Sequence, residues 1–178
     1  MRLAAITLLC LGSLFADASE WRFVTTTEKN SAVFVDIDSA KVKGGVLKFW
    51  SGTVKCKDLG GLIQTNQELV VRSQKKANDG YVPYSFTLNV WRRAFKENEK
   101  KNIIDMVVMW EAMVNELVMD FETKVLWEIN IEDDTFACLT GVLDGKIQPE
   151  TVPTWAHVPP ESQIEMMHQV INGLVLKK

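Results

Sequence analysis

The early part of the chain alternates between apolar and polar positions with a period of two, the pattern of half-buried β-strands. This alternation, rich in β-branched and aromatic residues, runs over 21–26, 32–37 and 46–55. Gly44-Gly45 lies before the third run, and paired glycines supply the positive φ angles of a tight hairpin turn. Residues 38–41 carry short polar side chains that can bond their own backbone in a turn. The pattern predicts an antiparallel sheet that begins near residue 21.

Farther along, the apolar spacing changes to that of a helix. From Asn102 the apolar side chains recur every three or four residues and share one stripe, formed by Ile103, Val107, Trp110, Val114, Leu117 and Phe121. The stripe has two interpretations. It packs in the core of the domain, or it forms a dimer or partner seam in which Val107 and Val114 are contact residues.

The residues before that helix carry a weaker signal. Residues 62–73 fit either a helix or a strand, 75–80 form a polar loop, and 84–90 alternate like a strand. We interpret the whole stretch 57–122 as a helical insertion into a sheet domain.

The last third of the chain returns to strands and closes with a helix. The predicted elements are strands over 123–131, 135–143 and 146–152, joined by turns at 132–134 and at Asp144-Gly145. A final helix begins at Ser162, which is placed to form a capping box with Glu165, and ends at Asn172-Gly173. The predicted fold class is therefore α+β: an antiparallel β-sheet with a C-terminal helix packed on it and an inserted helical segment.

The first eighteen residues have the layout of a secretory signal peptide. Arg2 precedes an apolar run from Leu3 to Phe15, and Ala16-Asp17-Ala18 places small residues at the cleavage positions. The run is too short for a permanent membrane-spanning helix. We expect cleavage after residue 18, a single domain over 19–178, and an exported protein in the periplasm or on the outer cell surface.

Charge and composition narrow the class of partner. The net charge of −3 offers no positive field for nucleic acid or for an anionic membrane, so neither is expected as a partner. Hydrophobic residues make up 47% of the chain, which is enough for a well-buried core.

Two cysteines remain once the signal is removed, because Cys10 lies within it. A lipid anchor at Cys10 is disfavoured, since the large Leu9 precedes it where a small residue is wanted. An even number of cysteines in an oxidising compartment makes a Cys56–Cys138 disulfide a candidate. Two separate buried thiols are the alternative.

The order and spacing of several short motifs resemble the surface-adhesin protein E family, small exported domains of Gram-negative bacteria. The matching motifs lie in 19–55 and 123–172: Trp21, Val33-Phe34-Val35-Asp36, Gly44-Gly45, Trp127-Glu128-Ile129-Asn130, Asp134-Thr135-Phe136, Trp155 and Val158-Pro159-Pro160-Glu161-Ser162. The resemblance implies a compact antiparallel sheet backed by the C-terminal helix, and binding to host extracellular proteins. Ile131 stands at the first family cysteine position and the last helix has no cysteine, so the family disulfide does not carry over.

Catalytic and metal-binding patterns are weak throughout the sequence. His157 lies in a Pro-rich segment beside Trp155 with no nucleophile motif, while His168 falls on the apolar face of the last helix. Glu132-Asp133-Asp134 lacks the spacing and the glycine of a calcium loop, and the glycine pairs lack a phosphate-binding context. We therefore expect no enzyme activity, cofactor or metal.

The sequence leads to two main hypotheses about function. The first is an exported, non-enzymatic binding module, adhesin-like, that contacts a host extracellular or periplasmic protein. Its candidate contact surface comprises Trp155, His157 and the inserted region 57–122. The second is a periplasmic structural or assembly protein that uses the Ile103–Phe121 stripe as an interaction seam, with a homodimer as one form.

Overall fold

The computed structural model describes residues 19–88, 91, 95–117, 120–143, 146–148 and 154–176. The expected signal peptide and the predicted turn at 144–145 lie outside these described residues. The strands are β1 (Trp21–Thr26), β2 (Ser31–Asp36), β3 (Lys41–Lys43), β4 (Val46–Lys55), β5 (Thr123–Asn130), β6 (Thr135–Leu143), β7 (Lys146–Gln148) and β8 (Ala156–His157). The helices are α1 (Cys56–Thr65), α2 (Gln67–Asn78), α4 (Glu97–Glu116) and α5 (Gln163–Ile171), with a 3-10 helix η1 (Tyr84–Thr87) and a π-helical turn η2 (Asn172–Leu176).

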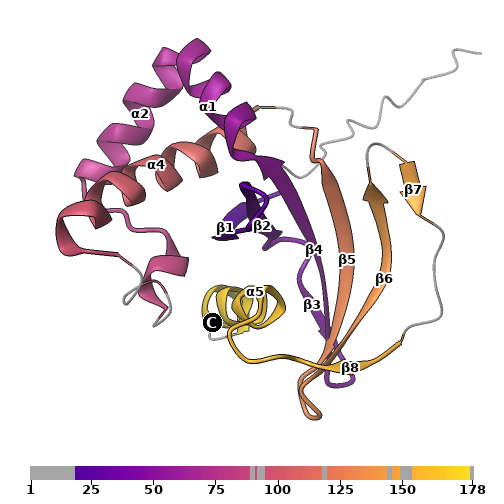
Figure 1. Cartoon of the computed structure of the whole chain (residues 1–178). Coiled ribbons are helices and arrows are strands. Elements are labelled where there is room, and N and C mark those ends of the chain that lie inside the picture. The colour runs from indigo at the N-terminus through magenta and orange to yellow at the C-terminus, as the bar shows by residue number, and fades with distance from the viewer. Residues whose placement is uncertain are drawn as a thin grey trace, which may run out of the picture.

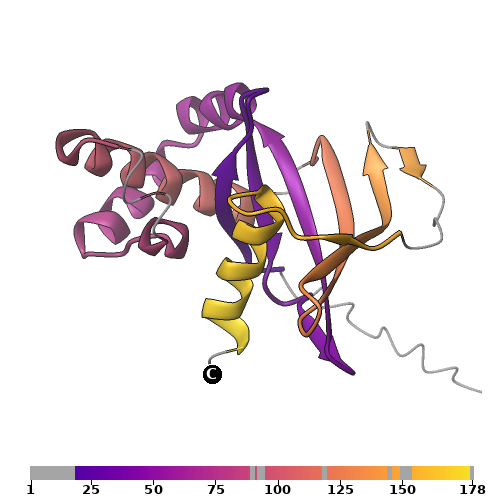
Figure 2. The ribbon, with the colours of Figure 1, turned by 60° about the horizontal axis from the view of Figure 1, so that its bottom comes forward.

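The strands form one antiparallel sheet in the order β1-β2-β4-β5-β6-β7, with β3 paired to β4 and β8 paired to β6. The α+β fold with a C-terminal helix on an antiparallel sheet is thus confirmed. Figures 1 and 2 show α1, α2 and α4 gathered beyond the β1 end of the sheet, away from β6 and β7. These three helices therefore do not cover the β6 and β7 edge of the sheet.

Strand β2 shows how the sheet is buried on both faces. All of its residues are buried. Ala32 and Phe34 join a core shared with α1, α2 and α4, whereas Val33 and Val35 join a second core shared with α5. Since successive side chains of a strand point to opposite faces, one strand serves both cores. This double burial explains why β2 reads as a nearly continuous apolar run.

The local predictions at the turns hold because the required contacts lie within a few residues. Gly44 and Gly45 adopt φ of 58° and 78° and join β3 to β4. The Ser162 hydroxyl accepts a hydrogen bond from the Glu165 backbone N–H at 3.2 Å, which caps α5. The helix predicted from Asn102 is α4, and it begins earlier, at Glu97.

The strand predicted over 84–90 is wrong, because Tyr84–Thr87 is the 3-10 helix η1. Its alternating aromatic residues serve two different cores: Tyr84 packs with the α5 core and Phe86 with the helical core. A short connection that passes β1 can therefore show the period of a strand without pairing in the sheet. Residues 89 and 90 lie outside the described part.

Candidate functional site

The outer edge of β1 is closed by side chains of α4 in place of another strand. The Asn115 amide oxygen accepts a hydrogen bond from the Trp21 backbone N–H at 2.7 Å, and its Nδ2 donates to the Trp21 carbonyl at 2.8 Å. Farther along, Glu111 Oε1 accepts from the Phe23 N–H at 3.1 Å, and the Trp91 indole N–H donates to the Val24 carbonyl at 3.0 Å. These contacts satisfy backbone groups that an edge strand otherwise leaves open. They also fix the position of α4 against the sheet.

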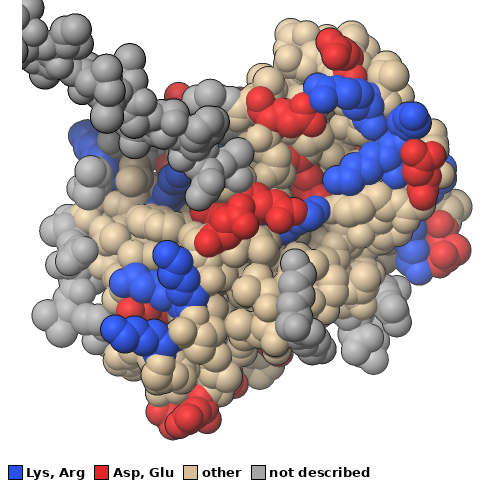
Figure 3. Space-filling view, turned by 180° about the vertical axis from the view of Figure 1, so that it is seen from behind, with Lys and Arg blue, Asp and Glu red and all other residues tan. Residues whose placement is uncertain are grey.

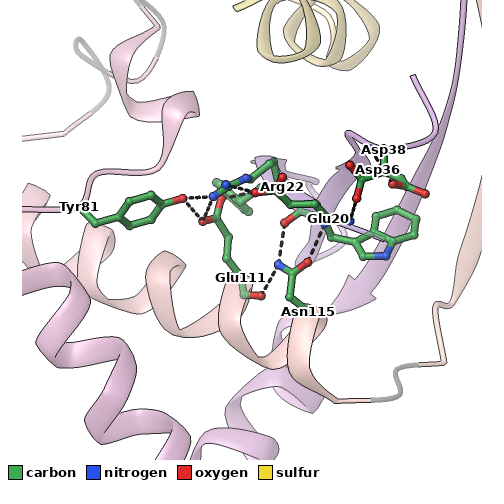
Figure 4. Close-up of polar contacts among 9 residues, drawn as sticks. Glu20, Arg22, Asp36, Asp38, Tyr81, Glu111 and Asn115 are labelled. Carbon is green, nitrogen blue, oxygen red and sulfur yellow. Dashed lines mark hydrogen bonds and ion pairs between the residues drawn. The ribbon is translucent and has the colours of Figure 1, made fainter. Parts of the chain in front are cut away.

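Glu111 lies at the centre of a polar network between the sheet and the helices (Figure 4). Glu111 is buried, with only 3% of the residue exposed. Oε2 accepts a hydrogen bond from the Tyr81 hydroxyl at 2.6 Å and lies 3.5 Å from the Arg22 guanidinium. Arg22 also donates to Tyr81 and pairs with Glu20. A buried charge that is paired and hydrogen-bonded in this way avoids the large cost of an isolated one.

Burial governs the titration of this network. Desolvation raises the pKa of Glu111, although the Tyr81 hydroxyl, Arg22 and the Phe23 N–H oppose the rise. Desolvation, together with the charge of Glu111, also raises the pKa of Tyr81 far above its ordinary value. Tyr81 therefore stays a neutral hydrogen-bond donor at any physiological pH. Its role in the network is to hold the carboxylate in place.

A cleft of about 340 Å³ opens above this network, between the start of β1 and helices α2 and α4. We call it the charged cleft, after its charged lining residues Glu20, Arg22, Arg72, Lys76, Glu111 and Glu116. Two small side chains, Ser73 of α2 and Ala112 of α4, also line it and leave the space between the helices open. Figure 3 shows acidic and basic side chains gathered beside one another on this side of the molecule.

The charged side chains at the mouth of the cleft differ in how they are paired. Arg72 of α2 and Glu116 of α4 form an ion pair at 2.8 Å, and their side chains are 58% and 44% exposed. Lys76 lies with its ammonium 3.9 Å from the centre of the Tyr81 ring, a cation–π contact. Within the described residues, Lys76 forms no ion pair with a carboxylate.

The stripe predicted as a seam is buried inside the chain itself. Val107 and Val114 are 1% and 4% exposed and pack in the core formed with α1, α2 and β1. Phe121 lies beyond the end of α4 and packs against Trp21 in a tilted arrangement, with ring centres 4.4 Å apart. Val107 and Val114 are therefore core residues, and their assignment as partner contacts is wrong.

The expected Cys56–Cys138 disulfide is absent, since both thiols are free. Cys138 lies opposite Trp127, which lies opposite Phe49, and Cys56 is seven residues farther along the chain than Phe49. At about 3.4 Å per residue, the seven residues alone separate the two cysteines by about 24 Å, whereas a disulfide needs Cα atoms within about 7 Å. Burial raises the pKa of both thiols.

Trp155 and His157 lie at the opposite edge of the sheet from the charged cleft. His157 belongs to β8, which pairs with β6, whereas the cleft lies at β1. Trp155 is 41% exposed and His157 is exposed as well, so both are accessible to a partner. The structure does not bring them together with any residue of the cleft.

Sequence reasoning missed the charged cleft. One usable signal was the four-residue spacing of Arg72 and Lys76, which places them on the same side of a helix. That signal had no value while 62–73 could be either a helix or a strand and 75–80 was predicted as a polar loop. The loop prediction is wrong for its first residues, because α2 continues to Asn78. The burial of Glu111 had no local signal, because its partners lie on β1 and in the loop after α2.

No helix in the described part of the chain is both long and apolar enough to cross a membrane. Comparison with known proteins finds no matching family model, and no curated protein or solved structure matches the chain.

Proposed function

We propose that this chain is an exported, non-enzymatic binding protein whose ligand occupies the charged cleft. The observation that carries the proposal is the set of charged side chains around one open hollow, fixed from below by the Glu111 network. Arg22 is held by Glu20, Tyr81 and Glu111, so its position is set before a ligand arrives. A site that is ordered in advance loses less conformational entropy on binding.

The size and lining of the cleft support a small polar ligand. Its volume of about 340 Å³ falls at the lower end of the range of small-molecule sites. The lining is charged, and a charged lining favours ligands whose own polar groups replace the water lost on binding. The ligand is either a free small molecule or one polar group displayed by a partner protein.

Blocking the cleft tests this proposal. We would titrate residues 19–178, labelled with ¹⁵N, with a panel of small polar compounds and follow the amides of Ser73, Ala112 and Asn115. Ala112→Leu places a larger side chain in the hollow and should weaken any binding at least tenfold. Ala77→Leu, the same change at a position of α2 that does not line the cleft, is the matched control. Binding that survives Ala112→Leu would place the site elsewhere.

A separate experiment tests export. Protease would be added to intact cells and to spheroplasts that make the full chain. Degradation on intact cells is the result expected for a surface protein. Protection until the outer membrane is opened is the result expected for a periplasmic one. A chain that stays protected in spheroplasts would refute export.

Protein binding through Trp155 is a second candidate function. Its large, exposed ring supports it, because exposed tryptophan is enriched among the residues that dominate protein interfaces. The resemblance to the adhesin family motivates a direct test with immobilised extracellular-matrix proteins. Trp155→Ala should abolish retention of the purified chain, whereas Ala112→Leu should leave it unchanged. Equal retention of the Trp155→Ala variant would remove this candidate.

A further inference from the structure

The ion pairs around the charged cleft indicate which sign of charge its ligand carries. Arg72 and Lys76 both line the cleft and lie four residues apart on α2, so their side chains share one face of that helix. Two cations at this spacing repel each other and slightly destabilise an exposed helix. An anion placed between them relieves that repulsion.

The carboxylates of the cleft are already committed. Both oxygens of Glu111 accept hydrogen bonds, from the Phe23 N–H and the Tyr81 hydroxyl, and Oε2 also faces Arg22. Glu20 pairs with Arg22, and Glu116 pairs with Arg72. A cationic ligand would have to break one of these pairs to gain a partner. At Glu116 that break costs little, but every carboxylate of the cleft already has a partner, whereas Lys76 forms no ion pair among the described residues.

The cations at the mouth are available. Lys76 has no ion pair among the described residues, and its ammonium rests on the face of the Tyr81 ring. The Arg72–Glu116 pair is more than two-fifths exposed on both sides. An exposed pair of this kind contributes little stability, so Arg72 can exchange Glu116 for a ligand oxygen at small cost. Ser73, between the two on the chain, is small and leaves room beside them.

From this arrangement we propose that the charged cleft recognises an anionic group, a carboxylate or a phosphate, held between Arg72 and Lys76. This inference rests on the proposed function and names the ligand class of the same site. Arg72 supplies a planar fork of donors that matches the oxygens of either group, and Lys76 supplies a compact point charge. Arg22 stays bound to Glu20 and Glu111 and contributes a fixed positive charge behind the anion.

Four probes distinguish the possibilities in ¹⁵N titrations of residues 19–178 at low ionic strength, where exposed charges are screened least. Succinate tests the carboxylate, inorganic phosphate tests the phosphoryl group, succinamide is the uncharged analogue of succinate, and putrescine is the cation. We expect succinate or phosphate to shift the amides of Ser73 and Lys76 in a saturable way. Succinamide and putrescine should leave them unchanged. The anion that binds more tightly shows whether the cleft recognises a carboxylate or a phosphate.

Variants assign the effect to named side chains. Lys76→Gln and Arg72→Gln should each weaken binding of the preferred anion at least tenfold. The matched control is Lys75→Gln, an exposed lysine next to Lys76 that does not line the cleft, and it should change affinity less than twofold. All three positions are exposed on α2, so the melting temperature of each variant should stay within about 2 °C of the unaltered chain.

The inference and the proposed function fail in different ways. Shifts at the cleft with putrescine or succinamide and not with the anions would overturn the anion assignment and leave a binding cleft in place. Equal weakening by Lys76→Gln and Lys75→Gln would also overturn it, because the anion would then be held by general surface charge. If no compound of the anionic, neutral or cationic kind perturbs the cleft, the proposed function itself is refuted.

Discussion

Replacing Asn115 with alanine tests whether α4 closes the edge of the sheet through hydrogen bonds. The Asn115 amide makes three of them: it accepts from the Trp21 N–H, and it donates to the carbonyls of Trp21 and Glu111. A neutral hydrogen bond contributes about 0.5–1.5 kcal/mol net, so three together contribute roughly 2–4 kcal/mol. Because Asn115 is only partly buried, water restores some of the lost bonds, and we expect a loss of about 2 kcal/mol.

The assays are urea unfolding and thermal unfolding of residues 19–178, both followed by tryptophan fluorescence. A loss of about 2 kcal/mol should lower the melting temperature by roughly 4–8 °C in a domain of this size. Asn115→Asp keeps the shape and the acceptor for Trp21 but removes both donors, so it should lose at least as much stability. Gln67→Ala is the control, because the exposed Gln67 amide bonds only to carbonyls of the neighbouring helix turns. It should cost less than about 0.5 kcal/mol.

A second measurement separates edge closure from simple packing. Amide hydrogen exchange at Trp21 should accelerate in Asn115→Ala more than exchange at the interior of β4, because only the β1 edge is opened. An edge strand without its cover also pairs with other copies, so the variant should associate at high concentration. The reasoning is refuted if Asn115→Ala costs less than about 0.5 kcal/mol, or if Asn115→Asp unfolds like the unaltered chain.

Further predictions concern the core, the cysteines and pH. A Cβ at Gly52 would lie 2.3 Å from the Phe121 ring, so Gly52→Ala should cost about 1–3 kcal/mol in urea unfolding. Adding Phe121→Ala to the same chain should recover part of that loss. If the losses of the two single variants simply add in the double variant, the clash is contradicted. Val107→Glu should unfold the domain in circular dichroism, whereas a folded variant with altered oligomeric state in light scattering would restore the seam. Thiol titration of chain purified without reductant should find Cys56 and Cys138 both free, with the exposed Cys138 reacting first, and a melting temperature that rises without reductant would contradict this. Burial lowers the pKa of His168, so the unfolded chain binds its proton more readily and stability falls as pH drops through about 6.5. His168→Gln should remove that part of the slope in urea unfolding measured at several pH values, and an unchanged slope would contradict this.

The sequence predicted the elements whose determinants are local. The Gly44-Gly45 turn, the Ser162 cap and the apolar stripe of α4 each depend on residues within a few positions of one another. Local patterns predicted the wrong element where one segment packs in two separate cores. The segment Tyr84–Thr87 alternates because its aromatic residues enter two separate cores, and the period of a strand arose there without a strand.

The candidate site depended on contacts that no local pattern carries. Tyr81 lies 59 residues from Arg22 and 30 from Glu111, and Asn115 lies 94 residues from Trp21. The same reason explains the incorrect disulfide, because counting cysteines gives no information on strand register. Register places Cys138 beside Trp127 and leaves Cys56 at the far end of β4.

By itself, the sequence determined the class of the fold, several of its turns and the start of its last helix, because backbone conformation responds first to neighbouring residues. The predicted end of that helix at Asn172-Gly173 is wrong, since η2 continues the helical backbone to Leu176. Only the tertiary structure decided which apolar stripe is core and which charges meet. Val107 and Val114 are core residues and not exposed partner contacts, because α1, α2 and β1 cover them. The charged cleft formed only because α4 docks on the β1 edge through hydrogen bonds and α2 packs beside α4.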